Sequence, residues 1–144
     1  MTQNSKKTPN SFWLIGVLAL IWNAFGVYFY LELKFMTDEM KSKIPVEQLS
    51  IIENTPAWAT AAFAIAVWFG FFGSILLLMR KKIAKGLFMI SLAGIFVQMI
   101  YNIFLLKSTE ISGSSRLIIP FLTISIGIFL IWQSKKYTEN GIVT

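Results

Sequence analysis

The side chains that could bind a molecule inside apolar surroundings are a few amides, one hydroxyl and two indoles. Asn23, Gln98 and Ser125 each lie near the middle of a long apolar run, and Trp22 and Trp68 occupy comparable positions. An amide in lipid needs a hydrogen-bond partner, so these side chains are expected to face inward. Amides that bind hydroxyls, beside indole rings that stack on a sugar-like face, predict a site for a small neutral polar solute.

The same amides have a simpler interpretation. Polar side chains in apolar helices often bridge neighbouring helices, and each bridge contributes roughly 0.6–2 kcal/mol to the stability of a bundle. Tryptophan in the middle of an apolar run is likewise compatible with ordinary packing. On helical spacing Gln98, Tyr101 and Asn102 share one face, at positions i, i+3 and i+4. The two interpretations differ in whether the polar partner belongs to the chain or to a bound molecule.

Catalytic and metal chemistry have few candidate groups in this sequence. It contains no Cys and no His, which removes thiol chemistry, soft metal ligands and a Ser-His nucleophile. The adjacent carboxylates Asp38 and Glu39 lie in a polar segment and are expected to be solvated. No charged side chain lies deep in an apolar run, where proton-coupled transporters keep a carboxylate. We therefore expect no catalytic residues, no metal site and no cofactor, and we do not expect an enzyme.

Four apolar runs would position the amides and indoles. The chain is 56% hydrophobic and 14% charged, whereas ordinary soluble domains are about a quarter charged. At ~1.5 Å per residue, a helix of about 20 residues covers the ~30 Å hydrocarbon core of a bilayer. The first run is long for a signal peptide and no small-residue cleavage site follows it, so we expect a retained span. The predicted spans cover residues 12–33, 57–79, 86–106 and 117–133.

The positions of the 13 Lys and Arg residues predict an orientation for these spans. Most of them lie near the N-terminus, in the connector 80–85 and in the C-terminal segment, whereas the connectors 34–55 and 107–116 carry fewer. By the positive-inside rule, both termini are cytoplasmic. Basic residues in short clusters between apolar runs are typical of membrane proteins and do not indicate nucleic-acid binding. The predicted fold is an all-α, polytopic, four-transmembrane-helix bundle that forms a single membrane domain in a lipid bilayer.

Small residues recur every fourth position on the second predicted span and at nearly this spacing on the first. Such ridges let helix backbones approach closely. We expect them to pack within the bundle, and the alternative is that the ridge on the second span docks on another protein. We expect Asn10 or Ser11 to cap the N-terminus of the first span, and Thr55 to cap that of the second. A short helix in the connector 34–55 is expected to start at Pro45. The expected packing residues are Ala62, Ala66, Gly70 and Ser74 on the second span, with Gly16 and Gly26 on the first.

Several stretches of the sequence resemble a family of small, uncharacterised bacterial membrane proteins with four helices. Proteins of that family are often labelled as sugar transporters. The resemblance implies a multi-pass protein of the bacterial inner membrane and adds a little weight to solute transport, but it carries no functional residues over. The resembling stretches are residues 11–13 with 21–23, 36–40, 56–67 and 76–82.

Two functions from different classes fit these observations. The first is facilitated passage of a small neutral polar solute such as a sugar. It would involve a homo-oligomer, because four helices enclose little volume on their own. The alternative is a non-transporting accessory or scaffolding subunit of a larger membrane complex.

Overall fold

A computed structural model describes residues 7–105 and 118–144 of the chain. The predicted connector 107–116 lies outside the described residues. The part that is described is all-helical, as predicted. Its elements are α1 (Asn10–Lys34), α2 (Asp38–Ser42), α3 (Val46–Glu53), α4 (Ala57–Leu78), α5 (Ile83–Ile100), the π-helix η1 (Tyr101–Leu105) and α7 (Ile118–Glu139).

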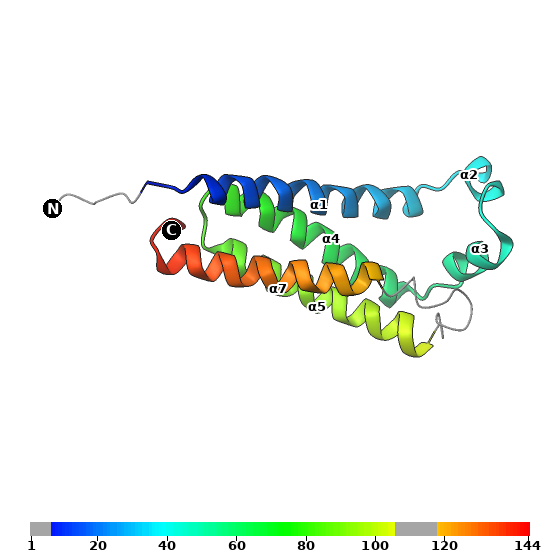
Figure 1. Ribbon diagram of the computed structural model, residues 1–144. Helices are drawn as coiled ribbons and strands as arrows, with labels where there is room; N and C mark the ends of the chain where they lie inside the picture. Colours follow the sequence, from blue (N-terminus) through cyan, green and yellow to red (C-terminus); the bar gives the residue numbers. More distant parts are fainter. Residues whose placement is uncertain (1–6, 106–117) are drawn as a thin grey trace.

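The four long helices form an elongated bundle. The helices α1, α4, α5 continued into η1, and α7 are each long and apolar enough to cross a membrane. α1 packs on α4, α4 on α5, and α5 on α7. α2 and α3 lie at one end of the bundle, which we call the α2–α3 end, and the opposite end holds the C-terminus and the turn between α4 and α5 (Figure 1). We call this opposite end the basic end, because Lys7, residues 80–85, Lys135 and Lys136 lie there.

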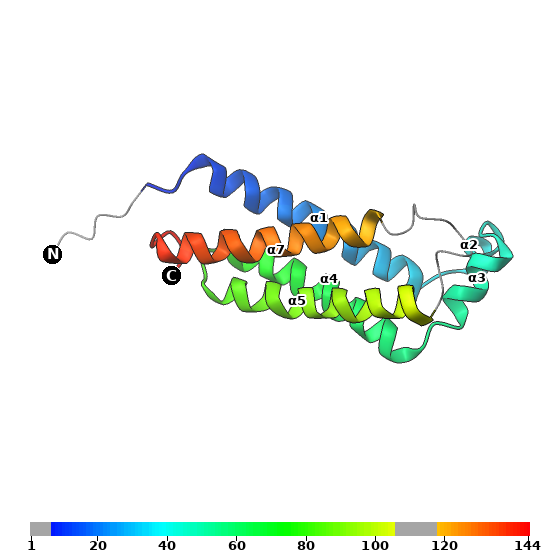
Figure 2. The ribbon, with the colours of Figure 1, turned by 60° about the horizontal axis from the view of Figure 1, so that its bottom comes forward.

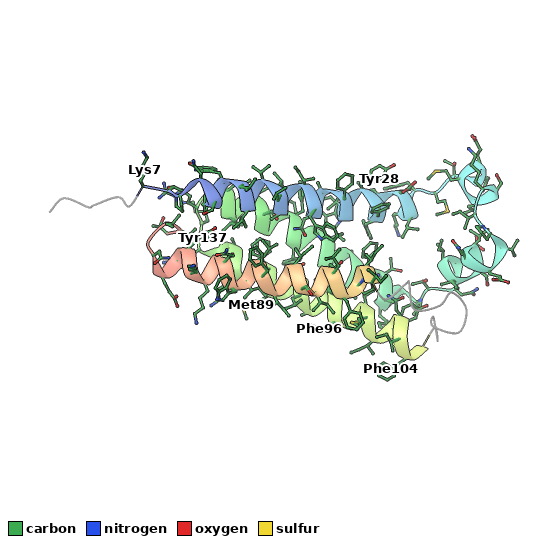
Figure 3. All side chains as sticks on the ribbon, in the orientation of Figure 1. Lys7, Tyr28, Met89, Phe96, Phe104 and Tyr137 are labelled. Atoms are coloured by element: carbon green, nitrogen blue, oxygen red, sulfur yellow. The ribbon has the colours of Figure 1, made fainter. Side chains whose placement is uncertain are left out.

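The outer surface of the bundle is strongly apolar. Tyr28 is 59% exposed and Phe104 is 74% exposed, and both side chains point away from the other helices (Figure 3). An exposed apolar surface that covers all four long helices is costly in water and is stabilised by lipid. The helices and their surface are therefore compatible with a multi-pass membrane protein.

The small residues of α4 lie at its contacts with α5 and α1. A Cβ atom added at Gly94 of α5 would lie 2.8 Å from the carbonyl oxygen of Ala62 and 3.0 Å from the backbone nitrogen of Ala66. The two backbones can therefore approach closely only because Gly94 has no side chain. Gly70 and Ser74 are also buried on α4. The ridge Ala62, Ala66, Gly70 and Ser74 is thus covered by neighbouring helices of the same chain.

The glycines of α1 face α4 in the same way. A Cβ atom at Gly16 would meet the side chain of Leu78, and one at Gly26 would lie 3.1 Å from Cγ1 of Val67. Both glycines therefore lie at the contact between α1 and α4.

The side-chain caps expected for the first two spans are wrong, whereas the expected start of the connector helix is right. Proline at position 9 precedes α1, which begins at Asn10 with no side-chain cap, so Asn10 and Ser11 lie inside the helix. Thr55 does not cap α4: its hydroxyl donates a hydrogen bond of 2.7 Å to the carbonyl of Ile51 and thereby closes α3. The start of α3 directly after Pro45 is confirmed.

α4 and α7 end side by side at the basic end with the same hydrogen-bond pattern. In α4, the backbone N–H of Lys81 donates to the Leu76 carbonyl at 2.8 Å, and that of Arg80 donates to the Leu77 carbonyl at 2.8 Å. In α7, the N–H of Ile142 donates to the Tyr137 carbonyl at 2.9 Å. Both ends are Schellman motifs, which place one residue in the left-handed region. These residues are Arg80, with φ of 61°, and Gly141, with φ of 67°.

The segment after α7 closes the basic end of the bundle. The N–H of Thr144 donates to the Arg80 carbonyl at 2.8 Å, and the N–H of Lys82 donates to the Thr144 carbonyl at 3.2 Å. Ile142 and Val143 are buried in one apolar cluster with Phe12, Leu77, Phe88, Leu130 and Tyr137. Figure 2 shows this return of the chain toward the start of α5.

Candidate binding cavities

A cavity of about 610 Å³ lies toward the α2–α3 end of the four-helix bundle, and we call it the lateral cavity. α1 and α7 supply two of its walls, and α4 and α5 supply the others. Its volume falls within the range of roughly 300–1,000 Å³ that is usual for small-molecule sites. The lining is mainly apolar and includes Phe25, Phe29, Ile95, Met99 and Ile119.

A second cavity of about 180 Å³ lies at the α2–α3 end, among α1, α3, α4 and α5, and we call it the end cavity. Its lining is more polar, with Tyr30, Lys34, Thr55, Thr60 and Tyr101. The two cavities have three lining residues in common, which we call the shared wall: Phe63, Gln98 and Asn102. The predicted common face of Gln98, Tyr101 and Asn102 is confirmed, since all three line the end cavity.

The structure brings three of the five predicted binding residues together. Trp22, Asn23 and Gln98 all line the lateral cavity. Ser125 and Trp68 do not line it. The hydroxyl of Ser125 donates to the Phe121 carbonyl at 2.9 Å on an exposed face of α7, and the indole of Trp68 stacks on Phe72 with ring centroids 5.8 Å apart.

The Asn23 amide links α1 to α4. Its Nδ2 atom donates to the Ala19 carbonyl at 2.8 Å and to Oγ of Ser74 at 3.2 Å. Its carbonyl oxygen lies directly over Gly70, where a Cβ atom would collide with it. Since both amide hydrogens are used within the bundle, Asn23 can offer a bound molecule only its oxygen. The helix-bridging interpretation therefore describes the observed contacts of this amide.

Two hydroxyls of the lateral cavity are also engaged within the chain. Oγ of Ser91 donates to the Ala66 carbonyl at 2.5 Å, which joins α5 to α4. Oγ1 of Thr123 donates to the Ile119 carbonyl at 2.8 Å, one turn back along α7. Each donor is thus satisfied, and each oxygen keeps acceptor capacity.

The Gln98 amide has different surroundings. It lies in the shared wall, partly buried, and makes no hydrogen bond with any residue that the structure describes. An amide in apolar surroundings without a partner costs free energy. Gln98 therefore has two amide hydrogens and a carbonyl oxygen available for a bound molecule at the junction of the two cavities.

A π-helical turn follows Gln98, and the residue pattern of this segment carries no signal for it. η1 continues α5 from Tyr101 to Leu105. Its first residue is buried, with the Tyr101 ring packed edge-on against Trp58 at 5.4 Å between centroids. π-Turns within helices occur frequently at functional sites, and this one begins in the lining of the end cavity.

The described residues thus form four membrane-length helices with a cavity between α1 and α7. Comparisons with protein-family models, with curated proteins and with solved structures find no match for the chain.

Proposed function

We propose that this chain binds a small neutral, hydroxyl-bearing molecule, with a sugar as the simplest representative, and facilitates its passage through the membrane. The observation that carries the proposal is the Gln98 amide, which faces two cavities and has no hydrogen-bond partner among the described residues. A bound hydroxyl would satisfy both the donor and the acceptor of this amide. Trp22 and Asn23 line the same cavity and supply an apolar ring and an acceptor oxygen.

The proposed location is the bacterial inner membrane, with both termini in the cytoplasm. Its support is the gathering of basic residues at one end of the bundle. Lys7 and Tyr137 mark that end in Figure 3, and residues 80–85, Lys135 and Lys136 lie there as well. The ammonium of Lys136 lies 5.2 Å from the centroid of the Trp132 ring. Aromatic residues are enriched at both membrane–water interfaces, and an excess of basic residues marks the cytoplasmic one.

Passage across the membrane requires more than one protomer or a rearrangement. The half of the bundle near the basic end is filled by the apolar cluster around Phe12, Leu77 and Tyr137. Because four helices enclose little volume, we propose that a continuous pathway forms between copies of the chain in a homo-oligomer.

Uptake by reconstituted liposomes tests the proposal. The purified protein should take up at least one labelled neutral sugar from a broad panel, and Gln98→Leu should lower that uptake at least tenfold. Because Gln98 makes no hydrogen bond with a described residue, this substitution should leave the helix packing intact. The matched control is Gln133→Leu, the same change at the basic end, which should retain uptake. Equal uptake by Gln98→Leu and the wild type would rule out the proposed site.

The accessory-subunit alternative predicts a different result. Docking by the ridge of α4 would require α4 to separate from α1 and α5, because Ala62, Ala66, Gly70 and Ser74 are buried against these helices. A partner would therefore have to bind another face. One stoichiometric partner that co-purifies in mild detergent, together with no uptake of any sugar in the panel, would favour this alternative.

A further inference from the structure

The two cavities differ in polarity along the bundle axis. The end cavity is lined by the hydroxyl-bearing residues Tyr30, Thr55, Thr60 and Tyr101. The two threonines donate their hydroxyl hydrogens to carbonyls of Ile51 and Pro56 and keep acceptor capacity. Most of the lateral cavity is lined by hydrocarbon side chains. The cavities meet at the shared wall, where the Gln98 amide lies. A molecule that filled both would therefore have a polar part at the α2–α3 end and an apolar part deeper in the bundle.

The lateral cavity has residues of α1 and α7 in its walls. At the basic end the two helices are in contact, with the rings of Phe12 and Tyr137 packed edge-on at 5.0 Å. Further along, both helices instead line the cavity, through residues such as Phe25 of α1 and Ile119 of α7. For a bundle in a membrane, the gap between these helices faces the hydrocarbon region. A molecule can thus reach Gln98 sideways from the lipid, although the basic end is closed by the buried cluster.

We infer that the molecule bound at Gln98 is an amphiphile, with a hydroxyl-bearing head at Gln98 and in the end cavity and a hydrocarbon chain in the lateral cavity. It enters between α1 and α7 from the surrounding lipid. The inference rests on the proposed function and narrows its substrate class.

The polar groups of the lateral cavity argue against a free sugar as the sole occupant. The donors of Asn23, Ser91 and Thr123 are already used within the chain. A free sugar in this cavity could donate only to the oxygens of these three side chains, and its remaining hydroxyls would face the hydrocarbon lining without a partner, which costs free energy. A hydrocarbon chain fills the same apolar volume without that cost. The end cavity, at about 180 Å³, has the more polar lining of the two.

Hydrogen bonding, rather than charge, defines the head. Lys34 lines the end cavity, but it is exposed to solvent, and the other lining side chains are uncharged. Because the amphiphile partitions into the bilayer, it reaches the cavity at a higher local concentration than a free sugar. A hydrocarbon tail on the ligand should therefore raise the apparent affinity of the protein for a sugar head.

Two substitutions on α7 separate cavity filling from a general effect of bulk. Thr123→Trp places a large ring in the lateral cavity, whereas Ser125→Trp places the same ring two residues further on an exposed face outside the cavity. Ile119→Trp is a second blocking variant, since Ile119 also lines the cavity and is 68% exposed. The full chain is studied in lipid nanodiscs. The probes are glucose, octyl glucoside below its critical micelle concentration, and 1-octanol, and the readout is the dependence of Tm on probe concentration.

The amphiphile inference predicts that octyl glucoside raises the Tm of the wild type and of Ser125→Trp with an apparent affinity at least tenfold higher than that of glucose. Thr123→Trp and Ile119→Trp should lose this advantage. Glucose and octyl glucoside that act alike, with no effect of the blocking variants but with loss in Gln98→Leu, would overturn the inference and leave the proposed function standing. No Tm shift by either sugar, or an equal shift by 1-octanol, would overturn both.

Discussion

Asn23 and Gln98 are both amides in apolar helices, but their partners differ. Asn23 donates to Ala19 and Ser74 and so connects α1 to α4, whereas Gln98 has no hydrogen bond with a described residue. Asn23→Leu should therefore lower the free energy of unfolding by roughly 0.6–2 kcal/mol, as loss of an interhelical hydrogen bond does. Gln98→Leu should leave it nearly unchanged. Unfolding in mixed micelles of increasing SDS content measures both, and the reverse ranking would contradict these roles.

Two glycines of α5 offer a matched pair of substitutions. A Cβ atom at Gly94 would meet backbone atoms of α4 at 2.8 Å and 3.0 Å, whereas one at Gly86 would meet nothing within 4 Å. Backbone atoms cannot move aside without shifting a helix, so Gly94→Ala should cost roughly 1–3 kcal/mol of stability. Gly86→Ala should instead stabilise the helix by about 0.5–1 kcal/mol.

Thermal unfolding in detergent compares these two variants with the wild type. A lower Tm for Gly94→Ala together with an unchanged or higher Tm for Gly86→Ala supports close packing of α4 on α5. Equal Tm values for the two variants would show that the helices do not approach closely at Gly94.

At the scale of the elements, the ends of α4 and α7 hold the basic end together. Gly141 has φ of 67°, a conformation that costs an ordinary L-residue roughly 1–2 kcal/mol. Gly141→Ala should therefore lower stability by about 1 kcal/mol and loosen Ile142 and Val143 from their buried positions. Gly141→Asn is the control, because Asn adopts this conformation more readily. Amide hydrogen exchange at Ile142 and Val143 reports the loosening, and equal exchange in both variants would count against the Schellman motif.

Hydropathy predicts the existence of the four long helices but not their ends. The third predicted span begins at residue 86, whereas α5 begins at Ile83. The fourth is predicted to end at residue 133, whereas α7 continues past Lys135 and Lys136 to Glu139. The physical reason is that apolar composition marks the extent of the hydrocarbon region. The backbone hydrogen bonds of a helix continue into water, where charged side chains are solvated.

The sequence predicts how deep in the bundle each candidate binding residue lies, but not whether its side chain points inward. Each long helix is apolar around most of its circumference, so the sequence carries little information on which face points inward. Similar depth alone therefore predicts one common site for all five residues, although Trp68 and Ser125 lie outside the lateral cavity. Gln98 and Asn102 were placed correctly on one face because their spacing along a single helix fixes their relative direction. The π-turn at Tyr101–Leu105 has no comparable signal in the sequence.

At the scale of the whole molecule, the packing order explains where the cavity lies. α1 packs on α4, α4 on α5, and α5 on α7, so α1 and α7 are the two outermost helices of the series. Their contact at the basic end involves Phe12 and Tyr137, and the segment 142–144 closes the same end. The opposite ends of α1 and α7 have no equivalent contact among the described residues. The described part of the bundle is therefore closed at the basic end and has its larger cavity between the two outermost helices, nearer the α2–α3 end.

The orientation of the bundle can be tested directly, because the chain has no Cys and single cysteines can be introduced without background. Ser42→Cys lies in α2 at the α2–α3 end, and Lys82→Cys and Lys136→Cys lie at the basic end. In spheroplasts of a bacterial host, a membrane-impermeant maleimide should label Ser42→Cys at once. It should label the other two only after the membrane is permeabilised, since basic residues are retained on the cytoplasmic side. Labelling of Lys82→Cys in sealed spheroplasts would invert the proposed topology and place the end cavity, with Gln98 beside it, on the cytoplasmic side.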